Sequence, residues 1–235
     1  MNSTSYKNPE GLTEVGHTTT TRDLATLSMR LLHDFPEYIG TYALKKYRYP
    51  GTPAANESNR NLLLFKDPTV DGLKTGHTNA AGYCLVATAK RDFPNVGSRR
   101  LMAIVLGTSS EIARANEAQK LLNWGYTAFE AVKLFDAGQA VATPAIWKGK
   151  TSTVKIGRAD ALVVAVPTGS AAQIKTQLAR PDPLVAPVTK GQTIGSLKVY
   201  RGEQLWVDMP LQALDAVEQA GVLGRAWDAL RLWIK

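Results

Sequence analysis

The stretch Val70-Asp71-Gly72-Leu73-Lys74-Thr75-Gly76-His77-Thr78 decides the fold of this chain. It is strand-like and leads into residues 82–89, and a second strand-like run covers residues 101–107. Residues 92–99 fit a hairpin connection between the two runs. Residues 109–110 are both serine and can cap a following helix, whose predicted apolar positions include Ile112, Ala115, Leu122 and Phe129. This order of strands and a helix indicates the end of an α/β or α+β domain.

The segment before this stretch is predicted to contain one helix. Residues 1–20 are rich in turn formers, and Thr20 or Thr21 can cap a helix that Pro36 ends. The apolar stripe of this helix follows the i, i+3, i+7 spacing with Leu24, Leu27 and Leu31. Residues 45–61 are polar and contain Pro and Gly, which predicts short strands and a loop.

From about Gly138 the chain changes to short β-rich runs separated by turn signals. These runs cover residues 151–156, 161–166, 195–200 and 204–211. Their spacing predicts a small all-β sandwich or barrel. No acid, base and nucleophile converge there, so we interpret the segment as a structural or binding module.

The last segment, residues 222–235, is predicted to form an amphipathic helix. Its apolar face carries Leu223, Trp227, Leu230 and Ile234, and its basic residues Arg225, Arg231 and Lys235 outnumber Asp228. Such a helix reaches about 21 Å, which is short of the ~30 Å hydrocarbon core of a bilayer. We therefore predict in-plane binding to an anionic membrane surface. The alternative is that the same stripe packs on the β-rich segment.

Composition narrows the classes of partner. The formal net charge is +8 and the isoelectric point is near 9.6, which favours nucleic acid, acidic lipid or a polyanionic cell wall as partner. The basic residues are scattered and no nucleic-acid motif appears, so no nucleic-acid partner is expected. Cys84 is the only cysteine, and no metal-ligand spacing is present, so neither a metal nor another cofactor is expected.

The tripeptide Lys74-Thr75-Gly76 carries the chemistry. With Ser-x-x-Lys and Ser-Asp-Asn it forms the signature of penicillin-binding proteins and class A β-lactamases. The segments around it resemble the low-molecular-mass penicillin-binding proteins, the serine-type D-alanyl-D-alanine carboxypeptidases, over essentially the whole chain. These segments are Asn8-Pro-Glu-Gly-Leu12, Thr21-Arg-Asp-Leu-Ala25, Asp34-Phe-Pro-Glu-Tyr38, Asn59-Arg-Asn61 and Asp71 to Tyr83.

The resemblance implies an α+β fold with three parts. Residues 1–137 would form the C-terminal part of a β-lactamase/transpeptidase-like catalytic domain. Residues 138–220 would form the β-rich C-terminal domain, and residues 221–235 an amphipathic membrane-anchor helix. The implied substrate is the peptidoglycan stem peptide, the implied inhibitors of the complete protein are β-lactam antibiotics, and the implied location is the periplasmic face of the inner membrane.

Four consecutive residues are the candidate catalytic set: Lys74, Thr75, Gly76 and His77. A peptide can add to a strand edge, and Gly76 has no side chain to block its approach. Thr75 can donate its hydroxyl to the substrate carboxylate or acyl carbonyl, and Lys74 places a positive charge beside it. The resemblance implies that the backbone N–H of His77 donates to the oxyanion, while the His77 side chain is expected to have a structural role.

Arg60 is the candidate substrate-binding residue outside the strand. The resemblance implies that it faces the cleft and holds the substrate's terminal carboxylate, which a guanidinium fork suits. The alternative is a solvated surface arginine.

The catalytic serine is expected to be absent from this chain. Members of the family carry Ser-x-x-Lys and Ser-x-Asn upstream of the Asn-Pro-x-Gly-Leu segment, which begins here at Asn8, and neither element is expected anywhere in this chain. We therefore expect Met1 to be an internal methionine of a longer gene and this chain alone to be inactive.

Three functions remain open at this stage. The chain is part of a carboxypeptidase, or it is a catalytically inactive, membrane-associated peptidoglycan-binding module. A class A β-lactamase is the third, but those domains end soon after the helix that follows the Lys-Thr-Gly strand, and about a hundred residues follow here.

Overall fold

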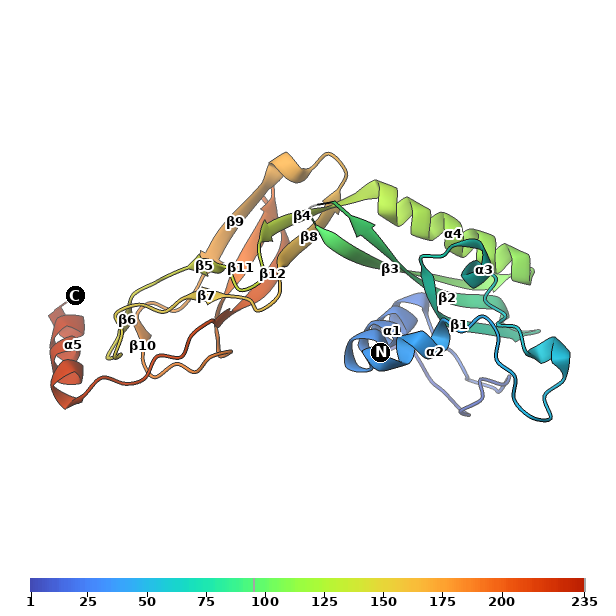
Figure 1. Cartoon of the computed structure of the whole chain (residues 1–235), viewed down its shortest axis with the longest axis horizontal. Coiled ribbons are helices and arrows are strands. Elements are labelled where there is room, and N and C mark those ends of the chain that lie inside the picture. Colours follow the sequence, from blue (N-terminus) through green and yellow to red (C-terminus); the bar gives the residue numbers. More distant parts are fainter. Residues whose placement is uncertain (95, 235) are drawn as a thin grey trace. The chain divides into compact units, whose positions relative to one another are not determined.

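The computed structural model describes residues 1–94 and 96–234, and of Ile234 the backbone alone. The chain divides into two compact units, Met1–Ala128 (unit 1) and Phe129–Lys235 (unit 2), coloured blue to green and green to red in Figure 1.

Unit 1 is built on an antiparallel sheet of β1 (Val70–Thr78), β2 (Gly82–Phe93) and β3 (Gly97–Thr108), in the order β1-β2-β3. α4 (Glu111–Ala128) packs on β2 and β3, while α1 (Thr21–Asp34) contacts β3 from the other face (Figure 1). Short helices connect these elements: η1 (Pro36–Tyr38), α2 (Ile39–Tyr42), η2 (Ala54–Asn56) and α3 (Leu63–Lys66). The predicted strands and the helix after them are therefore present.

Neither outer edge of this sheet, at β1 or at β3, has another strand beside it within the described residues. β1 pairs with β2 from Val70↔Ala89 to Thr78↔Gly82, and β2 pairs on its other side with β3. Within the described residues no strand pairs with the outer edge of β1. An open edge of this kind can accept an additional extended chain.

Helix α1 begins and ends as predicted, and its predicted apolar stripe is partly buried, with Leu24 and Leu31 half-buried and Leu27 exposed. The Thr20 hydroxyl accepts a hydrogen bond from the Asp23 amide, and the helix ends at Asp34, two residues before Pro36. Its buried residues are Asp23 and Ser28, whereas Leu27 keeps 44% of its surface exposed. Asp23 lies at one side of this face, where it accepts hydrogen bonds from the Ser3 amide and the Thr4 hydroxyl.

Unit 2 is β-rich, as predicted. Its main sheet has the order β5-β7-β12-β11-β9, and two smaller sheets pair β4 with β8 and β6 with β10. The bounds are β4 (Phe129–Phe135), β5 (Ala140–Ala142), β6 (Ile146–Trp147), β7 (Ile156–Gly157), β8 (Leu162–Pro167), η3 (Ala171–Gln173), β9 (Ile174–Ala179), β10 (Leu184–Val185), β11 (Thr193–Arg201) and β12 (Gln204–Ala213). The buried residues form one apolar core, which includes Ile156, Val166, Val199 and Leu211.

The division between the units differs from the predicted boundary at 137/138. Phe129, predicted on the helix, starts β4, and β4 pairs with β8 from Phe129↔Pro167 to Phe135↔Leu162. Residues 129–135 are therefore fixed by hydrogen bonds to a strand of unit 2.

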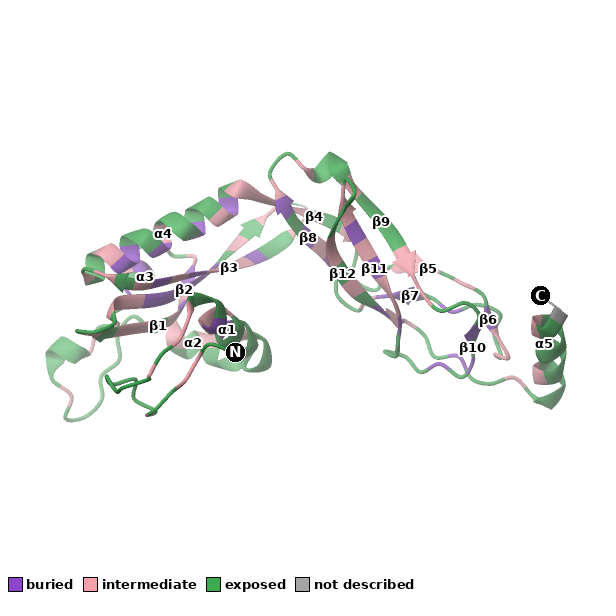
Figure 2. Cartoon of the chain, turned by 180° about the vertical axis from the view of Figure 1, so that it is seen from behind, coloured by how far each residue is buried: buried purple, intermediate pink, exposed green. Residues whose placement is uncertain are grey.

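Helix α5 (Val222–Ile234) contacts the rest of unit 2 through polar residues. Asp228 accepts a hydrogen bond from the Lys148 amide at 2.6 Å, and the Arg231 guanidinium lies 5.4 Å from the Trp147 ring centroid. The exposed residues of the helix include Val222, Leu223, Trp227, Leu230 and Trp233 (Figure 2). The predicted face residue Ile234, as a side chain, and Lys235 lie outside the described residues.

None of the described helices is both long enough and apolar enough to cross a membrane.

Candidate active site

Strand β1 carries the predicted catalytic set in one extended segment. Lys74 pairs with Val86, Thr75 with Leu85, Gly76 with Cys84 and His77 with Tyr83. Lys74 and His77 are exposed, while Thr75 and Gly76 are half-buried. The Lys74 ammonium group donates a hydrogen bond to the Thr75 carbonyl. The exposed lysine is therefore held against the strand that carries the other three residues.

Glycine at position 76 is not required by packing within the chain. A Cβ atom there would meet Cys84 Cβ at 3.8 Å, which is an ordinary contact. The space that Gly76 leaves is therefore available to a molecule approaching the strand.

The His77 side chain is held by an aromatic neighbour. Its ring stacks on Tyr83 with a centroid distance of 3.9 Å and an interplanar angle of 28°. Tyr83 lies in turn 5.5 Å from the Arg114 guanidinium. This stacking supports the predicted structural role of the His77 side chain.

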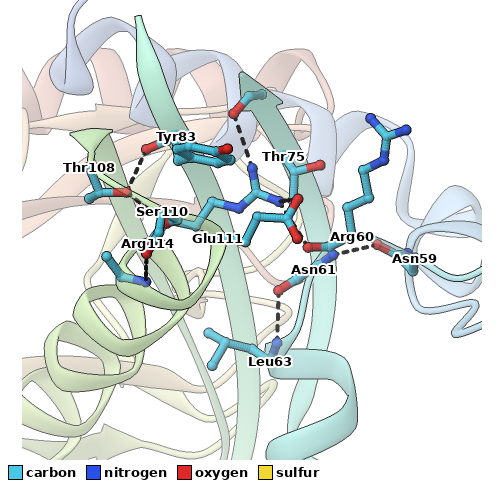
Figure 3. Close-up of polar contacts among 12 residues, drawn as sticks. Asn59, Arg60, Asn61, Leu63, Thr75, Tyr83, Thr108, Ser110, Glu111 and Arg114 are labelled. Atoms are coloured by element: carbon cyan, nitrogen blue, oxygen red, sulfur yellow. Dashed lines mark hydrogen bonds and ion pairs between the residues drawn. The ribbon is translucent and has the colours of Figure 1, made fainter. Parts of the chain in front are cut away.

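Arg114 on α4 connects the strand to the segment that carries Arg60. Its side chain is 2% exposed, and its guanidinium donates to the Gly76 carbonyl at 3.2 Å and to the Arg60 carbonyl at 3.0 Å (Figure 3). It also pairs with the Glu111 carboxylate at 3.2 Å. One buried cation thus fixes two backbone segments that are 16 residues apart in the sequence.

Arg114 was not predicted from the sequence, although its position on the buried face of α4 could have indicated it. The buried positions of α4 follow one face with Arg114, Ala115, Ala118, Leu122 and Tyr126. An arginine four residues before Ala118 on that face indicates a buried, hydrogen-bonded cation, because an unpaired charge there is too costly. The predicted apolar position Ile112 is instead 61% exposed.

Arg60 directly precedes a residue that is hydrogen-bonded to β1. The neighbouring Asn61 is buried and donates from its amide group to the Gly72 carbonyl of β1 at 3.1 Å. The Arg60 side chain is exposed, donates to Asn56 at 3.2 Å, and extends away from Arg114 in Figure 3. The role of Arg60 with a substrate carboxylate stays a prediction.

Two acidic residues stabilise the start of β1. Asp71 accepts a bidentate ion pair from Arg100 at 2.6 and 2.7 Å and a hydrogen bond from Thr88, which agrees with a role in shaping the strand. Burial alone would raise the pKa of Asp67, but hydrogen bonds from Thr69 and Arg91 lower that pKa below its ordinary value. Both carboxylates are therefore engaged by an arginine and a threonine of the same unit.

No metal site accompanies these residues. Within residues 1–94 and 96–234, no three His, Cys, Asp or Glu side chains are placed to bind one ion.

The expectation that Ser-x-x-Lys is absent needs a correction. The spacing occurs at Ser152-Thr153-Val154-Lys155, in an irregular segment of unit 2 before β7. Ser152 is exposed, and the Lys155 ammonium lies 3.9 Å from Asp215. On a helix the two side chains would share a face, which this irregular segment does not provide. Ser152 also lies after Asn8, whereas the catalytic Ser-x-x-Lys element of the family lies before the Asn-Pro-x-Gly-Leu segment.

Replacing Arg114 with Met is expected to loosen the site without disturbing unit 2. The Gly76 and Arg60 carbonyls would lose their donor, at a cost of about 2–4 kcal/mol. Hydrogen exchange measured by mass spectrometry should become faster at residues 59–63 and 72–78. Lys120→Met, an exposed cation on the same helix, is the matched control and should change nothing. Unchanged exchange in Arg114→Met would contradict this account.

Two protein-family models match this chain, one in each of its two units. Residues 1–110 match the family model of D-alanyl-D-alanine carboxypeptidase, and residues 129–219 match that of the penicillin-binding protein 5 C-terminal domain. The second match starts at the first residue of β4, where the structure divides the two units.

Individual relatives extend over nearly the whole chain. D-alanyl-D-alanine carboxypeptidase DacC of Escherichia coli is 35% identical over 97% of this chain and 56% of its own length. DacA of Haemophilus influenzae is 32% identical over 100% of this chain and 58% of its own length. The crystal structure of Haemophilus influenzae penicillin-binding protein 5 superimposes with a TM-score of 0.74 at 31% identity, covering 92% of this chain and 61% of the other.

The chain therefore spans a little over half the length of these curated relatives. The superposition confirms the predicted α+β fold, with part of a transpeptidase-like domain, a β-rich domain and a terminal helix. With a Lys-Thr-Gly strand at an open sheet edge and matches to both family models, the chain belongs to the low-molecular-mass penicillin-binding proteins of the D-alanyl-D-alanine carboxypeptidase family.

Proposed function

We propose that this chain supplies the Lys-Thr-Gly strand and the C-terminal domain of a serine-type D-Ala-D-Ala carboxypeptidase. The enzyme would remove the terminal D-alanine from peptidoglycan stem peptides. The observation that carries the proposal is the open edge of β1, on which Lys74–His77 lie in one segment held by the buried Arg114.

The proposed chemistry follows from this edge. The substrate peptide adds to β1 as an extra strand, with Gly76 leaving room for its backbone. Thr75 and Arg60 bind its terminal carboxylate, and Lys74 places a positive charge beside the reacting groups. The His77 N–H donates to the developing oxyanion, a contact worth about 3–4 kcal/mol.

The nucleophile is the part of the mechanism that β1 does not contain. We propose that it is a serine of a Ser-x-x-Lys element outside these 235 residues. Its hydroxyl attacks the D-Ala-D-Ala carbonyl, D-alanine leaves, and water hydrolyses the acyl-serine. β-Lactam antibiotics would acylate the same serine.

We further propose the periplasmic face of the inner membrane as the site of action. Unit 2 would act as a spacer between the membrane and peptidoglycan. α5 would bind the anionic surface in-plane through its exposed apolar residues.

A second candidate function is a catalytically inactive, membrane-associated peptidoglycan-binding module. The observation that favours it is the exposed apolar residues of α5, which suit a membrane surface. Under this alternative the chain binds peptidoglycan, but the addition of a Ser-x-x-Lys element does not produce carboxypeptidase activity.

Release of D-alanine tests the two candidates directly. A Ser-x-x-Lys-bearing segment from a complete member of the family would be joined before residue 1, and the fusion compared with the 235-residue chain. The fusion is expected to release D-alanine from a peptide ending in D-Ala-D-Ala, and the short chain is not. Thr75→Val in the fusion should reduce release strongly. A folded fusion without activity would favour the binding module.

A further inference from the structure

An arm of unit 1, residues 44–59, projects beyond the sheet in both Figures 1 and 2. Its two sides pair near the base, where Lys46 and Ser58 form an antiparallel bridge and the Tyr47 amide donates to the Glu57 carbonyl at 2.9 Å. The Asn59 amide donates to the Lys45 carbonyl at 2.8 Å. The arm is therefore a defined structural element.

A tight turn forms the middle of the arm. The Thr52 amide donates to the Tyr49 carbonyl at 3.0 Å, and Gly51 has a φ of 82°. Pro50 at the second position and glycine at the third are the residues that a type II turn favours. This turn fixes the direction of the segment that carries Tyr47 and Tyr49.

The surface of the arm is aromatic and cationic. Tyr47 and Tyr49 are 64% and 63% exposed, and the Arg48 side chain is 85% exposed. Lys45 and Lys46 add two more exposed cations, whereas Glu57, 3.4 Å from Arg48, is the one acid of the arm. Tyr47 and Tyr49 are two residues apart, so where the segment is extended they project to the same side.

The arm is fastened to the candidate site. The Asn59 amide group donates to the Leu44 carbonyl at 3.0 Å, which closes the base of the arm. The next residue is Arg60, whose side chain reaches back to Asn56 in the arm and whose carbonyl is held by Arg114. Because Arg114 also holds Gly76, the arm and β1 share one buried support.

We propose that this arm binds the glycan-linked, acidic part of the substrate, distal to the D-Ala-D-Ala end that β1 binds. The faces of sugar rings carry C–H groups that pack against exposed tyrosine rings, and the carboxylates of the stem peptide attract Arg48 and the two lysines. The inference deepens the proposed function and rests on it for the identity of the substrate. It assigns recognition of the glycan strand to residues that take no part in the chemistry.

Binding of soluble cell-wall fragments to the full 235-residue chain tests the arm. The probes are a disaccharide–pentapeptide and the same peptide without sugars, titrated by calorimetry at two salt concentrations. Tyr47→Ala combined with Tyr49→Ala is expected to weaken the disaccharide–pentapeptide by roughly tenfold and to leave the sugar-free peptide unchanged. Arg48→Gln should weaken both probes and reduce their salt dependence.

The control is Tyr6→Ala combined with Lys7→Gln, which removes an exposed tyrosine and a cation elsewhere in unit 1 and should change neither affinity. Wild-type affinity in the Tyr47/Tyr49 variant would overturn the proposal, as would an equal loss for both probes. The same variants are also tested for binding to anionic vesicles. If they lost affinity for the vesicles alone and kept their affinity for both cell-wall fragments, the proposal would be overturned, because the arm would then be a lipid-binding surface.

Failure of the arm and failure of the proposed function are distinguishable. The binding measurement needs no nucleophile, whereas D-alanine release from the fusion does not depend on the arm when the substrate is a short peptide that carries neither sugar nor an acidic side chain. Unchanged binding in the arm variants together with an active fusion would remove the arm alone.

Discussion

A fluorescent penicillin is expected to leave the 235-residue chain unlabelled and to form a stable covalent adduct with the fusion. Acylation requires a serine oxygen activated by a neighbouring base. Strand β1 supplies Lys74, Thr75 and a backbone donor. It does not supply a serine hydroxyl with a lysine three residues after it. The adduct survives denaturation, so fluorescence of the protein band on a denaturing gel measures it directly.

Two substitutions sharpen this result. Lys74→Ala in the fusion should slow labelling by roughly a hundredfold or more, because it removes the fixed charge beside the nucleophile. Lys90→Ala, an exposed lysine on β2, is the control and should label at the parent rate.

A labelled short chain would contradict the proposal. Ser152→Ala identifies the cause in that case, since Ser152 and Lys155 form the one Ser-x-x-Lys spacing in the sequence. Loss of the label in that variant would assign the nucleophile to unit 2.

The strands of unit 1 were predictable because their signals are local. The runs at 70–78, 82–89 and 101–107 are long and bounded by turn residues, and the structure extends them at the hairpin, to Phe93 and from Gly97, and by one residue at Thr108. Local signals do not state which edge of a sheet stays open, since that depends on pairing between distant segments. The open edge of β1 therefore emerged from the structure.

Arg114 shows why the site was only partly predictable. A motif identifies residues that touch a substrate, but not the side chain that holds the motif from the far side. Arg114 lies 38 residues after Gly76 in sequence and reaches it only because α4 folds back over the sheet. The same argument applies to the arm, whose bond between Arg60 and Asn56 has no sequence signature.

The shortest strands of unit 2 were beyond prediction for a different reason. β5, β6, β7 and β10 have two or three residues each, too few for a period-two pattern. Long-range pairing stabilises them, as in the parallel bridge between Ile146 and Leu184. The domain boundary moved for the same reason, because β4 is defined by its partner β8 and not by its own sequence.

Deletion of residues 222–235 is expected to abolish most binding of the chain to anionic vesicles. α5 contacts unit 2 through Asp228 and Arg231, which leaves Leu223, Trp227 and Leu230 exposed at 87%, 62% and 49%. Burying such side chains in the interfacial region is favourable, and tryptophan prefers that region. Each basic residue near an anionic surface adds about 1 kcal/mol, so neutral vesicles and high salt should both weaken binding.

A point variant separates the apolar face from a general loss of structure. Trp227→Ser combined with Leu230→Ser should lower co-sedimentation with anionic vesicles by at least roughly tenfold. Leu205→Ser, which removes a 48% exposed leucine of β12, is the matched control and should bind like the parent. Because Asp228 accepts a hydrogen bond from the Lys148 amide, Asp228→Ala tests the opposite arrangement, in which the helix must leave unit 2 to bind and the variant would bind more tightly than the parent. If the apolar variant and the deletion both bound as the parent does, the membrane would not be the partner of α5. Its exposed apolar residues would then contact a different partner.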